Sequence, residues 1–262
     1  MTGRWLGGLV SARATCVLAP NPGPMTLDGT NTWVLIEPGG GAAVVVDPGP
    51  DDDRHLRSVL AVARGQGATV GSVLLTHGHP DHSAGAASFA AMTGAPVRAL
   101  DPGQRLGEEG LAGGDVVSVG GLRLEVVATP GHTSDSLSFL LPADGAVLTG
   151  DTVLGRGTAV VAHPDGRLDD YLESLELLRD SVSSASLTTL LPGHGPVLTD
   201  AQAAIEHYLS HRRQRLDQVR AALAAGAVTA HQVVEVVYAD VDRALWPAAE
   251  LSVLAQLEYL RQ

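Results

Sequence analysis

Residues 72–82, SVLLTHGHPDH, decide the fold, because a short apolar run passes directly into four side chains of the metal-binding type. The apolar half predicts a buried strand. In the extended chain that follows, His77 and His79 project to the same side and can share one ion. The next proline breaks the extended path, so Asp81 and His82 open a helix and their side chains diverge from the first pair. One loop is therefore expected to supply ligands to two adjacent ions.

Three other predicted strand ends have the same form, an apolar run followed by a Pro or Gly turn and a ligand-type side chain. They carry His132 in TPGHT (129–133), Asp151 in LTGDT (148–152) and His194 in LPGHG (191–195). Loops at one edge of a rigid sheet are where functional groups are commonly placed. Together with the loop at 77–82, these positions make seven candidate ligands.

The sequence around these motifs alternates β-rich runs with helical periodicity, twice over. We expect strands at 32–36, 42–46, 72–75, 96–100, 115–119, 122–128, 137–141, 146–149 and 188–191, with helices at 52–65, 83–93 and 169–182. This mixture predicts an α/β fold with two sheets. After Asp200 only helices are expected, at 201–225, 230–238 and 248–260. The predicted domains are therefore 1–200, which is catalytic, and a helical module at 201–262.

Composition excludes several classes of function. All 17 basic residues of the 262-residue chain are arginine, which excludes Schiff-base and P-loop lysine chemistry. The net charge of −12 argues against extensive phosphate binding. Cys16 is the only cysteine and is expected to be buried, so a metal must be held by histidine and carboxylate. No apolar run approaches the ~18 residues that span a bilayer, and the run at 5–10 is too short for a signal peptide. A cytoplasmic protein without a membrane partner is expected.

Taken together, the seven ligand-type residues resemble the pattern of the metallo-β-lactamase superfamily, His-x-His-x-Asp-His followed by a distant His, Asp and His. The resemblance covers residues 14–200 and implies an αββα sandwich of two mixed sheets, with the metals in a groove at one edge. The resemblance implies that the first zinc is bound by His77, His79 and His132. It implies that the second is bound by Asp81, His82 and His194, and that Asp151 bridges the two. Such ligands suit two Zn²⁺, although Mn²⁺ or Fe would also be accepted.

Three further segments resemble the β-lactamase-like protein 2 group, which comprises metal-dependent endoribonucleases and related hydrolases. They are residues 21–33 (NPGPMTLDGTNTW), 46–50 (VDPGP) and 208–212 (YLSHR). The resemblance implies a small C-terminal winged-helix-like module. That group usually continues into a β-wing after the last helix, but this sequence ends at Gln262, directly after it. We therefore expect the wing to be missing, and we do not predict that a wing contacts nucleic acid here.

Two ions roughly 3.5–4 Å apart lower the pKa of a shared water to near 7, which predicts hydrolysis by a metal-bridging hydroxide. Asp81 and Asp151 are then catalytic as well as ligating. The substrate stays open between short single-stranded RNA, a thioester or small ester of the glyoxalase II type, and a lactone. An inactive binding module is the remaining alternative, and the complete ligand set weighs against it. The oligomeric state is also open.

Other candidates each have a functional and a structural interpretation. Asp47 either supports a ligand histidine or caps a strand-end turn, and Asn31 either lines the groove or sits at a strand edge. His163 is the spare histidine best placed to donate a proton, although a polar loop histidine is common. Histidines on predicted helices are expected to face solvent, namely His55, His207, His211 and His231.

The helix at 201–225 carries a cluster of arginines, including Arg212, Arg213 and Arg215. They either form a solvated helical face or extend a positive strip from the groove toward phosphates. The same helix has an apolar stripe formed by Ile205, Leu209, Leu216, Val219 and Leu223. We expect this stripe to pack on the catalytic domain, so that residues 201–262 form a helical lid beside the metals.

Overall fold

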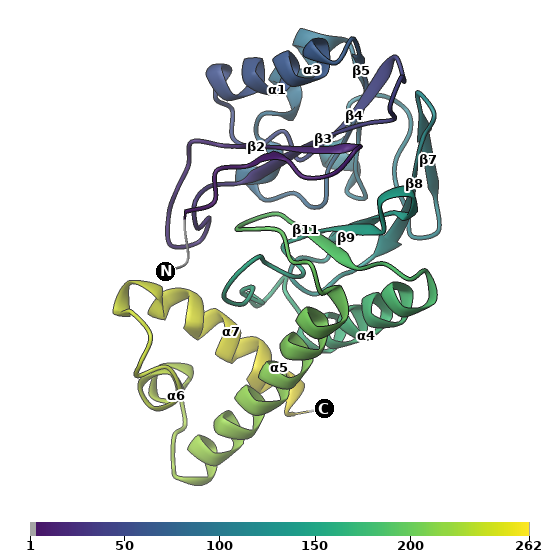
Figure 1. Cartoon of the computed structure of the whole chain (residues 1–262). Coiled ribbons are helices and arrows are strands. Elements are labelled where there is room, and N and C mark those ends of the chain that lie inside the picture. Colours follow the sequence, from purple (N-terminus) through teal and green to yellow (C-terminus); the bar gives the residue numbers. More distant parts are fainter. Residues whose placement is uncertain (1–3, 262) are drawn as a thin grey trace.

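Two β-sheets lie face to face, and helices cover the outer side of each sheet (Figure 1). The computed structural model describes residues 4–261. The first sheet has the strand order β1-β2-β3-β4-β5-β6, with bounds Gly8–Leu9, Ala14–Leu18, Asn31–Ile36, Ala42–Val46, Thr69–Leu74 and Val97–Arg98. The second has the order β11-β10-β9-β8-β7, and β7 to β11 span Val116–Val119, Leu122–Ala128, Leu137–Leu141, Ala146–Gly150 and Thr189–Pro192. The predicted αββα sandwich is confirmed.

The helices bury one face each. The helices α1 (Asp53–Gly65) and α3 (Ala86–Thr93) pack on the first sheet. The single-turn helix α2 (Pro80–Ser83) comes directly before α3 in the chain. The second sheet is covered by α4 (Leu168–Ser184), on which α5 (Ala201–Ala224) packs. The chain continues through α6 (Ala230–Val237), the 3₁₀ turn η3 (Arg243–Leu245) and α7 (Trp246–Tyr259). Two other 3₁₀ turns are η1 (Pro102–Gln104) and η2 (Pro142–Asp144).

Parallel strand pairs bring the candidate loops to one edge. β4 and β5 are parallel with α1 as their crossover, and β10 and β11 are parallel with α4 as theirs. The carboxyl ends of parallel strands lie at the same edge of a sheet. β4 reads AAVVV and is apolar on both faces because the sheet is covered on both faces. The predicted strands at 32–36 and 42–46 are present as β3 and β4, which pair antiparallel with Trp33 opposite Val46.

The structure differs from the element predictions at three places. The two N-terminal strands, β1 and β2, were not predicted, although β2 pairs with β3 along its whole length. β5 begins at Thr69 rather than at residue 72. Its first half alternates between exposed and buried residues and lacks the continuous apolar run from which the strand was predicted. The helix expected at 83–93 is divided into α2 and α3 at Gly85, whose N–H donates to the carbonyl of Gly49 at 2.9 Å. A Cβ at this glycine would meet the Pro50 carbonyl oxygen at 2.9 Å, so the close approach requires a glycine.

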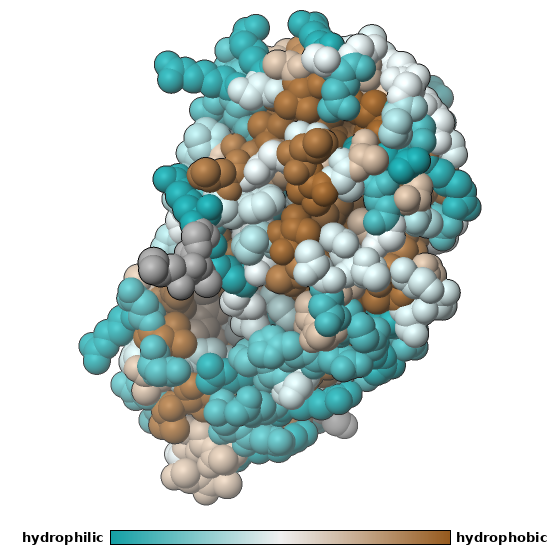
Figure 2. Space-filling model, in the orientation of Figure 1, coloured by the Kyte–Doolittle hydropathy of each residue, from teal (hydrophilic) through white to brown (hydrophobic). Residues whose placement is uncertain are grey.

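The C-terminal helices share a core with the second sheet. Ile205 and Leu209 of α5 are buried against Tyr171 and Leu175 of α4, and Figure 2 shows mostly hydrophilic side chains over the surface where Figure 1 places α4 and α5. Two members of the predicted stripe do not pack on the catalytic domain. Val219 is buried against α6 and α7 instead, and Leu223 is 36% exposed near the end of α5.

In the part of the chain that the structure describes, no strand follows α5, and no helix has the length and apolar character needed to cross a membrane. The division into domains at residue 200 stays a prediction.

We expect Leu209→Ala to lower the free energy of unfolding by about 2–5 kcal/mol, because it leaves a cavity in the core shared by α4 and α5. Chemical denaturation measures this change. Ser210→Ala, at the neighbouring exposed position of α5, is the control and should be nearly neutral. Equal stability of the two variants would contradict the shared core.

Candidate metal centre

The seven predicted ligands meet at one edge of the sandwich. They come from the loops that follow four strands: β5 (His77 to His82), β8 (His132), β10 (Asp151) and β11 (His194). Their ligand atoms form three overlapping groups, and within each group these atoms lie within 4.8 Å of one another. The groups are His77, His79 and His132; His77, His82 and Asp151; and Asp81, His82 and His194.

In the first group, three ring nitrogens converge. Nδ1 of His79 lies 3.0 Å from Nε2 of His77 and 3.1 Å from Nε2 of His132. Neutral imidazole carries one N–H and one lone pair, so three rings facing one point cannot all be satisfied by one another. A cation at that point satisfies all three lone pairs, as in histidine-bound zinc.

The second group has two ring nitrogens and one carboxylate. Nε2 of His82 lies 3.2 Å from Nε2 of His194. Oδ2 of Asp81 is 3.3 Å from the His82 nitrogen and 3.2 Å from the His194 nitrogen. The two nitrogens and one oxygen thus surround a common point beside the first group.

Asp151 lies between the two groups. Its Oδ2 is 3.3 Å from Nε2 of His194 and 3.7 Å from Nε2 of His132, and its Oδ1 is 3.5 Å from Nε2 of His82. Oδ1 is buried and has no hydrogen-bond partner among the residues that the structure describes. A buried carboxylate oxygen without a partner is costly. The donor set therefore fits metal ions, and Asp151 lies within 3.7 Å of histidines from both groups.

The outer nitrogens of two histidines face backbone carbonyls. Nδ1 of His132 lies 2.6 Å from the Val160 carbonyl oxygen, and Nδ1 of His194 lies 3.2 Å from that of Gly29. A carbonyl only accepts, so Nδ1 of each ring carries an N–H, and Nε2, which faces the cluster, is the atom left to bind a cation.

Asp47 orients two more histidines. Its Oδ2 accepts from Nδ1 of His82 at 2.9 Å and from the hydroxyl of Thr76 at 2.6 Å. The same hydroxyl lies 3.0 Å from Nδ1 of His77 and can accept its proton. Oδ1 accepts from the Thr76 backbone N–H at 2.8 Å. Asp47 therefore contacts a ligand histidine directly and holds the ligand loop, which is the geometry of the supporting interpretation.

Burial and charge set the protonation of the cluster. Burial, with neighbouring histidines, lowers the pKa of His77 well below its ordinary value, so this ring is neutral. Burial alone would also lower the pKa of His194, but Asp151 and Asp81 raise it to about 9. For both carboxyl groups burial opposes ionisation, yet contacts with His82 and His194 lower the pKa of Asp81 and of Asp151 below the ordinary range. Ionised carboxylates beside imidazoles form an attractive site for a divalent cation.

Asn31 is fully buried and does not line the groove. Its amide donates to the carbonyls of Pro192 and Gly195 at 2.9 Å each, on either side of His194. Its Oδ1 accepts from the indole of Trp5 at 2.8 Å. The groove interpretation is therefore wrong for Asn31, which instead fixes the loop that carries a ligand.

His163 does not join the cluster. Its Nε2 lies 3.3 Å from a carboxylate oxygen of Glu258 on α7, and the residue is not among those lining the cavity next to Asp151. The structure thus gives no contact through which His163 would donate a proton at the metal edge.

The three candidate arginines do not form one strip. Arg212 is only 4% exposed, donates to the Ala159 carbonyl, and stacks its guanidinium on Tyr171, so a solvated position is wrong for it. Arg213 is exposed, pairs with Glu176 at 3.3 Å and lines a different depression. Arg215 packs on the ring of Tyr238 and donates to the Val237 carbonyl at 2.6 Å.

Two helical histidines also differ from expectation. His55 is buried on the inner face of α1, and its Nε2 lies 2.9 Å from the hydroxyl of Thr32. His211 is half-buried beside a cavity, whereas His207 and His231 are exposed as predicted. Helical position alone does not reveal which face a neighbouring element covers.

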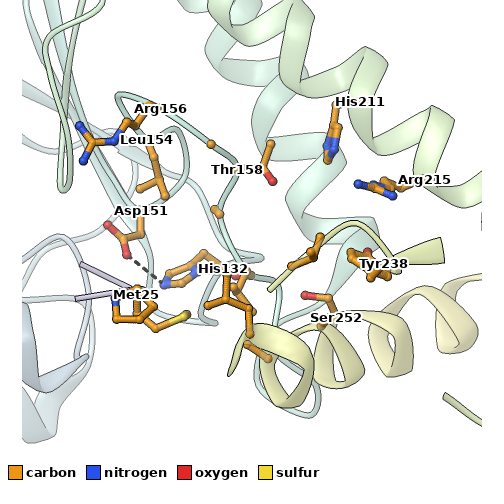
Figure 3. Close-up of a pocket in the computed structure, with 18 of the residues that line it drawn as sticks. Met25, His132, Asp151, Leu154, Arg156, Thr158, His211, Arg215, Tyr238 and Ser252 are labelled. Carbon is orange, nitrogen blue, oxygen red and sulfur yellow. Dashed lines mark hydrogen bonds and ion pairs between the residues drawn. The ribbon is translucent and has the colours of Figure 1, made fainter. Parts of the chain in front are cut away.

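A cavity of about 310 Å³ opens beside the cluster and was missed by sequence reasoning. Asp151 and His132 lie at one end of it, as Figure 3 shows. Its walls come from the loops before β3 and after β10 and from the C-terminal helices, and they include Met25, Leu27, Leu154, Val160, Val241 and Leu245. Met25 is a large apolar side chain that is 50% exposed in a proline-rich loop. An apolar residue in such a loop was the feature of the sequence that could have indicated a binding cavity.

Known proteins resemble this chain over most of its length. Residues 25–194 match the metallo-beta-lactamase superfamily, and residues 229–262 match the beta-lactamase associated winged helix domain. The chain is 32% identical to a beta-lactamase-like protein 2 homolog of Caenorhabditis elegans, over 88% of this chain and 78% of the relative. It is 33% identical to the atrochrysone carboxyl ACP thioesterase of Aspergillus fumigatus, over 88% of this chain and 75% of the relative.

Among solved structures, a metallo-beta-lactamase family protein from Thermus thermophilus has a TM-score of 0.78 at 23% identity, covering 95% of this chain and 93% of that one. This likeness supports the fold. The residues matched by the superfamily include all seven candidate ligands. The chain therefore belongs to the metallo-beta-lactamase superfamily, carries the winged helix domain associated with it, and is a metal-dependent hydrolase.

Proposed function

We propose that this protein hydrolyses acyl thioesters whose acyl group occupies the apolar cavity. The observation that carries the proposal is the position of this cavity, which begins at Asp151 and His132 and continues between apolar side chains toward the C-terminal helices. A thioester carbonyl at the metal edge would direct its acyl group into that space.

The walls of the cavity suit a hydrocarbon. Leu154 and Leu27 approach from the loops, and Val241, Leu245 and Ala249 approach from the C-terminal module. Each buried methylene contributes about 0.8 kcal/mol when it leaves water. An acyl chain of several carbons would gain binding energy here that a phosphodiester backbone would not.

The residues of the cluster would hold two metal ions, with His77, His79 and His132 around one, Asp81, His82 and His194 around the other, and Asp151 in contact with both. When bound, Zn²⁺ or a similar ion supplies an activated water and polarises the attacked carbonyl. The chain fixes the ligand rings in orientation through Val160, Gly29 and Asp47. The C-terminal helices form one wall of the cavity beside the site.

The arginines do not support short single-stranded RNA as the substrate. Arg212 is buried and Arg213 faces away from the cavity, so the positive strip that would contact phosphates is not formed. The Aspergillus fumigatus relative, by contrast, is named as a thioesterase. Thioester hydrolysis is therefore the better-supported member of the substrate classes that the sequence left open, ahead of RNA and lactones.

We expect purified protein to bind about two zinc-type ions per chain. Asp151→Ala removes the carboxylate shared by both groups, so turnover should be lost and metal content should fall below that of the wild type. Elemental analysis after dialysis measures the metal independently of activity. Asp180→Asn, on the exposed side of α4, is the control. Full metal content and normal turnover of Asp151→Ala would refute the bridging position.

Asp47→Asn should weaken metal binding and turnover about 10–100-fold, because the amide no longer accepts equally from Thr76 and His82. Competition with a chromogenic chelator measures the affinity. The melting temperature of the same sample separates a local change from unfolding. If Asp47→Asn binds metal as tightly as the wild type, the orientation of the ligands does not depend on this carboxylate.

For the substrate, we expect kcat/KM to rise from acetyl to hexanoyl thioesters, and we expect an unstructured RNA to stay intact at low and at high salt. Ala248→Phe should lower activity on hexanoyl more than on acetyl thioester, because it fills the cavity. Ala244→Phe adds the same ring at an exposed position outside the cavity and is the matched control. RNA cleavage without thioester turnover would reverse the proposal.

A further inference from the structure

The cavity has a polar end on the side away from the metal edge. In Figure 3, Asp151 lies on one side, and His211, Arg215 and Tyr238 lie on the opposite side. These three side chains come from α5 and from the residue that follows α6. An apolar acyl chain that starts at Asp151 would therefore point toward nitrogen donors.

Two residues of the cavity wall also carry a buried nitrogen that has no partner in the described part of the chain. Arg212 is only 4% exposed and donates through Nη2 to Ala159, but its Nε has no hydrogen-bond partner. Nδ1 of His211 is also buried without a partner. An unsatisfied donor on a buried cation is costly, because charged groups lose most from desolvation. Both residues line the cavity.

Charge at this end is uncompensated. Among the described residues, neither Arg212 nor Arg215 forms an ion pair with a carboxylate, and the acidic residue that lines the cavity, Asp151, lies on its other side. Burial, followed by the charges of Arg212 and Arg215, lowers the pKa of His211 to about 4, so this ring is neutral at neutral pH and keeps one N–H to donate. The group that fits between these donors is an anion with oxygen acceptors.

We propose that the polar end formed by His211 and Arg215, with the charge of the buried Arg212 behind it, binds a carboxylate at the far end of the acyl group. The preferred substrates are then monothioesters of dicarboxylic acids. This inference rests on the proposed thioesterase function. Hydrolysis balances without a co-reactant: water adds across the C–S bond, and a free thiol and a dicarboxylic acid leave.

The test uses N-acetylcysteamine thioesters in pairs of equal length, one neutral and one with a terminal carboxylate: butanoyl and succinyl, hexanoyl and adipoyl, octanoyl and suberoyl. At the length that matches the cavity, we expect kcat/KM to favour the carboxylate about tenfold or more, mainly through KM. Arg215→Gln should remove this preference, and Arg215→Lys should retain part of it. Arg213→Gln changes the same charge on the exposed side of α5 and should keep the full preference.

A binding measurement separates failure of the inference from failure of the proposed function. With metal removed by a chelator, calorimetry should detect adipamate, which has a carboxylate at one end and an amide at the other, binding to wild type but not to Arg215→Gln. Hexanamide should bind more weakly. If no thioester is cleaved but adipamate binds in this way, the proposed function fails and the anion site stands. Equal turnover of neutral and carboxylate thioesters, or binding indifferent to Arg215, overturns the inference.

Discussion

The carboxylate of Asp47 holds the metal edge together. It follows β4, accepts from the backbone and the hydroxyl of Thr76 after β5, and accepts from Nδ1 of His82 on α2. Asp47 has φ +52°, a left-handed conformation that is uncommon for residues other than glycine. Backbone strain of this kind persists where the surrounding structure fixes it. Since Thr76 also contacts His77, one strained residue orients a ligand in each half of the centre.

Close packing at the same edge explains the glycines that precede two of the ligands. A Cβ at Gly150 would lie 2.7 Å from Cβ of Thr76, and a Cβ at Gly193 would lie 2.5 Å from Oδ1 of Asp151. The loops after β10 and β11 can therefore reach the loop after β5 only because these positions carry no side chain. The Gly-Asp and Gly-His pairs in the sequence mark the backbone approach that assembles the centre, as well as the ligands themselves.

Local patterns were sufficient to predict the ligand loops, because each one is a strand, a turn and a ligand in consecutive residues. Burial on helices was not predictable in the same way. Arg212 lies between Leu209 and Leu216 on the buried side of α5, and its guanidinium is accepted there only because Tyr171 and the Ala159 carbonyl come from distant parts of the chain. His55 on α1 is likewise buried, and its partner Thr32 comes from the strand β3. Such partners depend on tertiary structure, which helical periodicity does not contain.

The net charge of −12 gives little guidance to the site, because local potential governs the binding of small ligands more than total charge does. Acidic side chains exposed on the outer surface, such as Glu176 and Asp217, compensate exposed arginines there. Arg212 is buried and Arg215 is half-buried, each against an aromatic ring, and neither has such compensation among the described residues. The first sheet and the second sheet supply the reactive edge, and the C-terminal helices supply the opposite wall of the cavity. Under the proposed function, substrate choice would depend on the helical module, because that part of the cavity brings cations to the end remote from the reacting bond.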